Sequence, residues 1–256
     1  MPKWDANLYL QFGQERTQAA IDLLSRISIV EPERIIDLGC GPGNSTAILR
    51  ERYPEADIIG LDSSPDMIEQ AHGRDLNVEW RLGDISSLEP RDMYDLIFAN
   101  AALQWIPDHK SLFANLVSHL SEVSALAVQL PYHHASPLQQ VILKASRHAA
   151  WDDRMESARA ALTYEESLFY YDVVGPLWSR IDLWETEYIT SKDKPKAILD
   201  FIRGSGLRPF VQVLERKKEI QDFEAMILDG YTKAYPVREG GKVLFPFKRH
   251  FIVAYS

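Results

Sequence analysis

Residues 35–46 of the chain, IIDLGCGPGNST, decide its fold. Two isoleucines, typical of a buried strand, lead into Asp37. Three glycines then follow at alternate positions: Gly39, Gly41 and Gly43. Glycine allows a positive φ and has no Cβ to block a ligand, so the stretch predicts a strand that turns into a helix where a nucleotide-like ligand lies against bare backbone. An NAD fingerprint would have another glycine in place of Asn44. We therefore expect an adenosyl ligand other than NAD.

Strand and helix patterns alternate through the first half of the chain. Short apolar runs predict strands at residues 34–38, 57–62 and 78–85, within residues 93–106, and at residues 125–131. Apolar residues or helix-start signals predict helices at residues 15–29, 44–52, 63–73 and 109–120. This alternation predicts an α/β fold, Rossmann-like and doubly wound, with a mostly parallel sheet and helices on both faces.

The second half of the chain has a different pattern. Residues 137–175 are helical in pattern and rich in Trp, Tyr and Arg, whereas residues 181–189 and 242–255 alternate like the last two strands. Helices are predicted between these strands, at residues 192–203 and 211–234, and Pro246 predicts a break or an edge in the final strand. We expect a single domain over residues 1–256, with an N-terminal helical lid segment (1–30) and a helical cap insertion after the fifth strand (134–180).

The composition is ordinary for a globular enzyme. Of 256 residues, 46% are hydrophobic and 25% charged, which excludes a disordered chain and accommodates one large α/β domain. The formal net charge of −9 leaves no basic surplus for the phosphates of nucleic acid or an anionic membrane. We therefore expect a small-molecule substrate, no nucleic-acid partner and no membrane partner. A monomer is compatible with the sequence.

The cysteine and histidine content narrows the chemistry further. The single cysteine, Cys40, excludes an internal disulfide and suits a reducing compartment. The seven histidines are too scattered for metal-ligand spacing, so no metal is expected. The N-terminal residues lack a signal-peptide pattern and no apolar run reaches membrane-spanning length, so we expect a cytoplasmic protein.

Acidic residues end the predicted strands at the edge where ligands bind in such sheets. Asp62 stands nineteen residues after Gly43, where a carboxylate can accept hydrogen bonds from ribose hydroxyls, although it could instead cap the following helix. Asp84 could accept from an adenine amino group while Ile85 packs on the ring. Asp37 would face a cationic end of the ligand. No lysine follows the glycine loop, which argues against a phosphate site.

The residues that would bind a second substrate are more scattered. Trp105, after the fourth strand, either lines the reacting centre through its indole face or packs on the strand edge. Other candidates together would form a cationic, hydrogen-bonding rim suited to an anionic small molecule, although each alone is more typical of structural or surface positions. They are Trp4, Tyr9, Arg16, His133, Tyr170 and Arg208. No nucleophilic triad is evident.

The motifs together resemble the class I S-adenosylmethionine-dependent methyltransferases. The resemblance rests on DLGCGPGNST, GLDSSPDMI, GDI and the segment after the fourth strand. It implies a seven-stranded sheet with an antiparallel last strand, and S-adenosylmethionine as cofactor with S-adenosylhomocysteine as product. The implied cofactor residues are Gly39, Gly41, Asp62, Ser63, Asp84, Ile85 and Asn100.

A narrower resemblance covers nearly the whole chain. WDANLYLQFGQER, DLIFANAALQWIPDH, FYYD and SGLRPF are similar to methyltransferases that esterify a small tricarboxylic acid. A carboxylate acceptor is already ionised at neutral pH and needs no general base, so the lack of a recognisable base fits this activity. Burying several negative charges needs an arginine, for which Arg208 is the first candidate and Arg16 the second.

Three alternatives remain open from the sequence. His133, His134 and residues 147–162 depart from the resembled pattern, so the acceptor could be another small or carrier-bound acid, or a hydroxyl compound. The chain could also bind S-adenosylmethionine without catalysis. An NAD oxidoreductase is disfavoured by Asn44.

Overall fold

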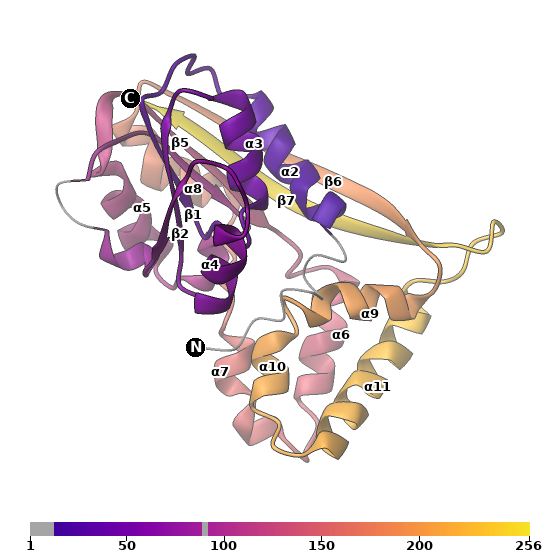
Figure 1. The fold of residues 1–256 in the computed structure, drawn as a ribbon. Helices are drawn as coiled ribbons and strands as arrows, with labels where there is room; N and C mark the ends of the chain where they lie inside the picture. The colour runs from indigo at the N-terminus through magenta and orange to yellow at the C-terminus, as the bar shows by residue number, and fades with distance from the viewer. Residues whose placement is uncertain (1–12, 89–91) are drawn as a thin grey trace.

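The computed structural model describes residues 13–88 and 92–256 and contains a seven-stranded sheet with the order β3-β2-β1-β4-β5-β7-β6 (Figure 1). The strands are β1 (Arg34–Leu38), β2 (Asp57–Asp62), β3 (Glu79–Leu82), β4 (Tyr94–Asn100), β5 (Leu120–Pro131), β6 (Arg180–Lys192) and β7 (Val243–Tyr255). The first five strands are parallel, and β7 runs antiparallel to both β5 and β6. The predicted doubly wound, mostly parallel sheet with an antiparallel last strand is confirmed.

Helices cover both faces of this sheet because its central strands are apolar on both sides. Ile35 packs with α2 (Gly13–Ser25) and α3 (Asn44–Arg52) on one face. Its neighbour Ile36 lies in the core on the other face, together with α5 (His109–Val117) and α8 (Ser167–Val174). α4 (Pro65–His72) packs beside β2 and β3. Successive strand residues thus enter opposite cores, as expected for a sheet buried on both faces.

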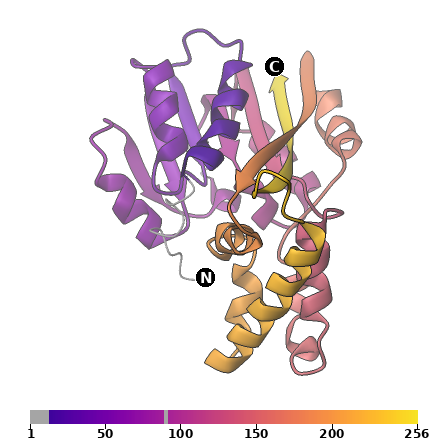
Figure 2. The ribbon, with the colours of Figure 1, turned by 90° about the vertical axis from the view of Figure 1, so that its right-hand side faces the viewer.

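The remaining helices form a lobe with a core of its own. They are α6 (Pro137–Ser146), α7 (Glu156–Arg159), α9 (Pro195–Arg203), α10 (Arg208–Gln212) and α11 (Lys217–Ala234). Figure 2 shows this helical lobe below the sheet, with α11 alongside α6. A Cβ at Gly230 of α11 would meet Val141 of α6 at 2.5 Å, so the two helices approach closely there. Tyr231 donates a hydrogen bond to the Leu138 carbonyl, 3.0 Å away.

The lobe draws on two segments of the chain. Within the predicted cap (134–180), α6 and α7 enter the lobe, but α8 packs on the sheet instead. Residues 195–234, between β6 and β7, supply the rest of the lobe, which the sequence did not assign to the cap. Of the predicted lid segment (1–30), residues 1–12 lie outside the described part, and α2 lies against the sheet.

Pro246 does not break the last strand. It pairs with Ile189 of β6, whereas β5 pairs only with Arg249–Tyr255, so Pro246 lies where β7 has β6 as its one sheet neighbour. That position is locally an edge, where a residue without an N–H is tolerated. β6 and β7 extend past the other strands toward the lobe (Figure 1).

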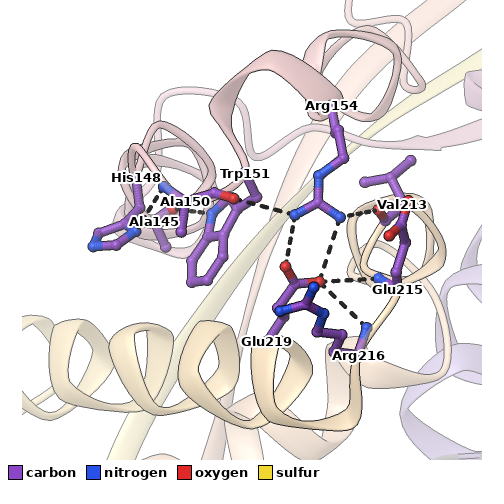
Figure 3. Close-up of polar contacts among 9 residues, drawn as sticks. All are labelled: Ala145, His148, Ala150, Trp151, Arg154, Val213, Glu215, Arg216 and Glu219. Carbon is purple, nitrogen blue, oxygen red and sulfur yellow. Dashed lines mark hydrogen bonds and ion pairs between the residues drawn. The ribbon is translucent and has the colours of Figure 1, made fainter.

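An ion pair inside the lobe joins its two segments (Figure 3). Arg154, in the short helix η3 (Asp152–Arg154), donates to both carboxylate oxygens of Glu219, at 2.7 and 3.3 Å. Glu219 also accepts from the backbone N–H groups of Glu215 and Arg216, at 3.1 and 3.3 Å. A hydrogen-bonded, bidentate pair of this kind is stronger than a simple surface ion pair. It holds the start of α11 against the chain before α7.

Acid is expected to lower the stability of the helical lobe by protonating Glu219. The Arg154 side chain and two backbone N–H groups lower the pKa of Glu219 from 4.5 to about 2. A carboxyl with a depressed folded-state pKa contributes stability above its unfolded pKa, and that contribution is lost as pH falls from 4.5 toward 2. Thermal unfolding followed by circular dichroism from pH 6 to 3 should therefore show a smaller fall in Tm for Glu219→Gln than for the wild type. Parallel curves for the two proteins would contradict this role.

Candidate active site

A cavity of about 630 Å³ lies between the carboxyl ends of the strands and the helical lobe. This volume is in the range of small-molecule sites. The sheet supplies one wall through the loops after β1, β2, β3 and β4, and the lobe supplies the other through α6, the end of α9 and the start of α10. The polar or glycine residues along these walls are Gly39, Gly41, Asp62, Ser63, Ser64, Asp66, Asp84, Asn100, Gln104, His133, Gln139, Ser205, Gly206, Arg208 and Arg249.

The glycine loop adopts the conformation that its sequence predicts. Gly39, Gly41 and Gly43 have φ values of 67°, 55° and 83°, in the left-handed region that favours glycine. The N–H groups of Gly39 and Cys40 both donate to the Leu61 carbonyl, at 2.7 and 3.0 Å, which ties the loop to the end of β2. Gly39 and Gly41 line the cavity. Gly43 does not line the cavity, because this residue, which directly precedes α3, packs against Trp80 of β3.

Asp37 lies beneath the loop rather than on the cavity wall. It is fully buried and accepts hydrogen bonds from the hydroxyls of Ser45 and Thr46, at 2.7 and 2.6 Å. Burial raises the pKa of Asp37 to about 6, against the lowering effect of the two hydroxyls. Its carboxylate therefore joins the loop to the first turn of α3, and direct contact with a ligand stays a prediction.

Asp62 joins the glycine loop to the start of α4. One carboxylate oxygen accepts from the Gly41 N–H at 2.9 Å, and the other accepts from the Ser64 N–H at the start of α4, at 2.8 Å. Burial raises the pKa of Asp62, while those backbone donors and the charge of Arg208 lower it. Asp62 also lines the cavity. It thus orients the glycine loop and the residue that precedes α4, while ribose binding by its carboxylate stays a prediction.

Asp84 and Ile85 come together at the next strand end, as predicted. Both line the cavity, with the Asp84 carboxylate accepting from the Ser86 N–H at 2.8 Å. Ser63 also lines the cavity, between Asp62 and α4. These groups come from the loops after β2 and β3, so one end of the cavity is acidic.

Asn100 ends β4 with an unsatisfied acceptor. Its Oδ1 is buried and has no hydrogen-bond partner among the residues that the structure describes. The next residue, Ala101, has a φ of 54°, a strained value for a residue with a Cβ, and its N–H donates to the Gln129 carbonyl at 3.0 Å. Strain of this kind is common where a chain positions ligand-binding groups. A buried oxygen without a donor suits a ligand that carries N–H groups.

Trp105 and Arg208 meet in the cavity although 103 positions separate them in the sequence. Trp105 ends the short helix η2 (Leu103–Trp105), and the guanidinium carbon of Arg208 lies 5.9 Å from the centre of its ring. Burial lowers the pKa of Arg208 to about 10, which the Asp62 charge partly offsets, so the side chain stays positively charged at neutral pH. The pair places a cation beside an indole on the boundary between the acidic end and the lobe.

His133 lines the cavity in a neutral form. It is 9% exposed, and its Nδ1 lies 3.2 Å from the Tyr164 hydroxyl. Burial, with help from the nearby Arg249 charge, lowers the pKa of His133 to about 3. Such an imidazole is a weak base at neutral pH.

Four predicted acceptor residues either lie away from the cavity or fall, wholly or by their side chain, outside the described part of the chain. Tyr170 of α8 is buried in the sheet core, with its hydroxyl 2.6 Å from His109 Nδ1, so it does not line the cavity. The sequence could not show whether Tyr170 lies in the sheet core or on the cavity wall, because an apolar helical segment that carries a tyrosine hydroxyl fits either place. Trp4 and Tyr9 lie outside the described residues, as does the side chain of Arg16.

Sequence reasoning missed Arg249, which lines the cavity from β7. The apolar residues of the second cavity wall were missed too, including Phe201 and Ile202 of α9 and Phe247 of β7. Residues 201–209 are brought to the site by the connection between β6 and β7, far along the chain from the glycine loop. A cationic residue inside an apolar strand was the available signal for Arg249, because an isolated charge in such a strand is costly unless it serves a ligand or a partner.

Comparison with known proteins decides the family. A family model described as a methyltransferase domain matches residues 29–199. A trans-aconitate 2-methyltransferase of Azoarcus sp. (strain BH72) is 40% identical over 257 residues, covering 99% of each chain. That of Escherichia coli O45:K1 is 40% identical over 255 residues, covering 99% of this chain and 98% of the relative.

This chain belongs to the trans-aconitate 2-methyltransferase family. It is an S-adenosylmethionine-dependent methyltransferase, as its motifs predicted. The fold agrees, since the Bacillus subtilis YcgJ protein matches with a TM-score of 0.59 at 15% identity, over 95% of this chain and 98% of that one. Coclaurine N-methyltransferase, bound to N-methylheliamine and S-adenosylhomocysteine, matches with a TM-score of 0.56 at 16% identity, over 93% of this chain and 71% of that one.

The acidic end of the cavity fits the methyl donor of this family. S-adenosylmethionine carries a sulfonium and an ammonium, both cationic, and ribose hydroxyls that donate hydrogen bonds. The carboxylates of Asp62 and Asp84 are acceptors of matching charge and polarity, as is the Asn100 Oδ1, which has no partner within residues 13–88 and 92–256. The left-handed glycines leave bare backbone beside them. Among the described residues no helix is long and apolar enough to cross a bilayer, and no cluster of side chains could hold a metal ion.

Proposed function

We propose that this protein transfers the methyl group of S-adenosylmethionine to one carboxylate of trans-aconitate, giving a monomethyl ester and S-adenosylhomocysteine. The family relatives bear the name of this activity. The observation that carries the proposal is Arg208, a partly buried cation that lines the cavity beside Trp105, where the acidic end meets the apolar residues of the lobe. A guanidinium in such surroundings is suited to a carboxylate.

The cofactor roles divide among the strand ends. Asp62 and Ser63 would hold the ribose, Asp84 and Ile85 the adenine, and Gly39, Gly41 and Asn100 the methionine part, with Trp105 at the reacting centre. Their common position on the acidic cavity wall supports this division. Asp37 and Gly43 would act indirectly, by fixing the loop. When bound, S-adenosylmethionine supplies an activated methyl group on a positively charged sulfur.

The described residues support a reaction without a general base. An acceptor carboxylate is ionised at neutral pH, so its oxygen can attack a methyl group directly. His133 is held neutral and weakly basic by burial, which suits this chemistry. Arg208 would fix the carboxylate in line with the methyl group, and the apolar lobe wall would exclude water. Catalysis then rests on orientation.

The apolar lobe wall favours one second candidate, another carboxylic acid with a larger apolar part. Leu138, Ile142 and Leu162 contribute to this wall. A hydroxyl acceptor would need a base and is not favoured by the neutral His133. We further propose that the enzyme works in the cytoplasm on a free acid, because its net charge is −9 and its single cysteine needs no oxidising compartment.

Methyl transfer to a panel of acids tests the proposal. Purified protein and methyl-labelled S-adenosylmethionine are incubated with trans-aconitate, cis-aconitate, isocitrate, citrate and a medium-chain fatty acid. Label is expected in a monomethyl ester of trans-aconitate, with the other acids slower. Transfer to another acid but not to trans-aconitate would refute the acceptor. Binding of S-adenosylhomocysteine with no transfer to any acid would favour a non-catalytic binding protein.

Asp62→Ala is expected to weaken cofactor binding by about 1–3 kcal/mol, the usual cost of a lost charge-assisted hydrogen bond. Isothermal titration with S-adenosylhomocysteine measures it. Because the same carboxylate accepts from Gly41 and Ser64, Tm should also fall. Asp66→Ala, another acid of the same wall in the first turn of α4, separates general charge from position, and it should lower affinity less. Unchanged affinity in Asp62→Ala would confine Asp62 to the structural role of joining Gly41 to Ser64.

A further inference from the structure

Arg249 is a buried cation fixed on the sheet side of the cavity. It is 6% exposed and lines the cavity from β7, at the position that pairs with Pro131 of β5. Its Nη1 donates to Oε1 of Gln129, 2.9 Å away, and its guanidinium carbon lies 4.8 Å from the centre of the Phe247 ring. The amide and the ring orient the planar fork of donors, so the side chain is preorganised.

Charge is segregated within the cavity. The carboxylates among its described lining residues, Asp62, Asp66 and Asp84, all lie at or after the ends of β2 and β3, at the cofactor end. The described residues of the other end are apolar or neutral apart from Arg208 and Arg249. That end therefore carries one buried and one partly buried positive charge and no described carboxylate on its wall, an arrangement suited to a ligand with more than one negative charge.

The two arginines come from opposite walls. Arg208 begins α10 in the lobe and stands beside Asp62 and Trp105, close to the cofactor end. Arg249 lies on the sheet beside His133 and Phe247, opposite the last residue of β5. A ligand that touched both would bridge the sheet and the lobe. With Arg208 near the methyl donor and Arg249 farther away, the two contacts would also determine which carboxylate of the ligand reacts.

We propose that Arg249 binds a carboxylate of the acceptor that is not methylated, and so selects di- and tricarboxylic acids over monocarboxylic acids. This inference rests on the proposed function, because it places the reacting carboxylate at Arg208. Gln129 serves as a positioning residue, since its carboxamide oxygen holds one end of the guanidinium. Arg249 is thus a specificity-determining residue that leaves the methyl donor untouched.

Acceptor selectivity of an Arg249→Gln variant tests the proposal. The kcat/KM values for trans-aconitate and for crotonate, a monocarboxylate with a similar trans alkene, are measured by label transfer. Loss of a charge-assisted contact should lower kcat/KM for trans-aconitate by about 30-fold or more and leave that for crotonate within about threefold. Calorimetric titration of trans-aconitate into the complex with S-adenosylhomocysteine should show the same weakening, with S-adenosylhomocysteine affinity unchanged.

Lys248→Gln is the matched control. It removes one positive charge from the neighbouring position of the same strand, where Lys248 pairs with Glu185 at 3.2 Å and does not line the cavity. Both acceptors should react normally with it. Arg249→Lys keeps the positive charge but lacks the planar guanidinium. Its kcat/KM for trans-aconitate should fall less than in Arg249→Gln, again without a matching fall for crotonate. This variant tests the proposal if Arg249→Gln does not fold.

Two different results would separate failure of the proposed function from failure of the role given to Arg249. If wild-type protein methylates crotonate and not trans-aconitate, the proposed function is wrong and this inference with it. If wild-type protein methylates trans-aconitate but the Arg249 variants lose both acceptors equally, the inference alone is overturned, and Arg249 is a structural residue of the sheet.

Discussion

Replacing Gly39 by alanine is expected to destabilise the protein by about 2–4 kcal/mol, the sum of overpacking and left-handed strain. Gly39 has a φ of 67°, and a Cβ there would overlap the side chain of Ala102. Ala102 immediately precedes η2, which carries Trp105, so relief of the overlap must shift a segment that lines the cavity. Affinity for S-adenosylhomocysteine should fall at least about tenfold, because misplaced binding groups lose their geometry.

Thermal unfolding and isothermal titration check the two effects separately. Gly240→Ala is the control, since a Cβ at that exposed turn would meet nothing within 4 Å and its φ is not positive. It should change neither Tm nor affinity appreciably. If Gly39→Ala keeps both values as well, Ala102 moves aside without cost and the close approach of β1 and the β4 loop is not needed for the site.

The fold was predictable because its signals are local. Each strand of the first half carries its own apolar run and acidic end, and residues such as Ile35 and Ile36 show burial on both faces by being adjacent and apolar. The predicted strand at residues 78–85 is shorter in the structure, ending at Leu82. Its last residues form a turn into η1 (Ile85–Ser87), because the Asp84 side chain accepts from Ser86 and caps it. Strand ends depend on such caps, which apolar patterning does not reveal.

The cofactor side of the site was predictable for the same reason. Gly39, Gly41, Asp62 and Asp84 each follow a recognisable strand, and parallel strands bring their ends together. Asn44, which argued against NAD, accepts a hydrogen bond from Arg74 in the structure. A glycine there would leave Arg74 without that acceptor.

The acceptor side was not predictable, because its residues meet only through tertiary packing. Arg249 sits in an apolar strand, and the partner that orients it, Gln129, is 120 positions away. The lobe wall combines residues from two insertions whose helical patterns give no sign that they share a core. Tyr170 shows the opposite error: it was predicted to bind the acceptor, but its hydroxyl contacts His109 inside the core.

Arg208→Gln is expected to lower kcat/KM for the acceptor by about 100- to 1,000-fold, which is about 3–4 kcal/mol, within the range for removing one partner of a buried charge contact. The loss should exceed that of Arg249→Gln, because Arg208 stands beside Trp105 and Asp62 and would hold the carboxylate that reacts. Unlike Arg249, it should also affect the cofactor. The Arg208 charge lowers the pKa of Asp62, so its removal raises that pKa further above the ordinary value.

The pH dependence of cofactor binding separates these effects. A carboxyl with a higher pKa is protonated at a higher pH, so the S-adenosylhomocysteine affinity of Arg208→Gln should begin to fall at a higher pH than that of the wild type as the solution is acidified. Arg238→Gln removes an exposed positive charge from the turn before β7 and should match the wild type throughout. A fall in affinity that begins at a higher pH, with normal acceptor kinetics, would confine Arg208 to supporting Asp62. Weakened acceptor kinetics with an unchanged pH dependence would instead mean that Arg208 acts on the acceptor without tuning the ribose-binding carboxylate.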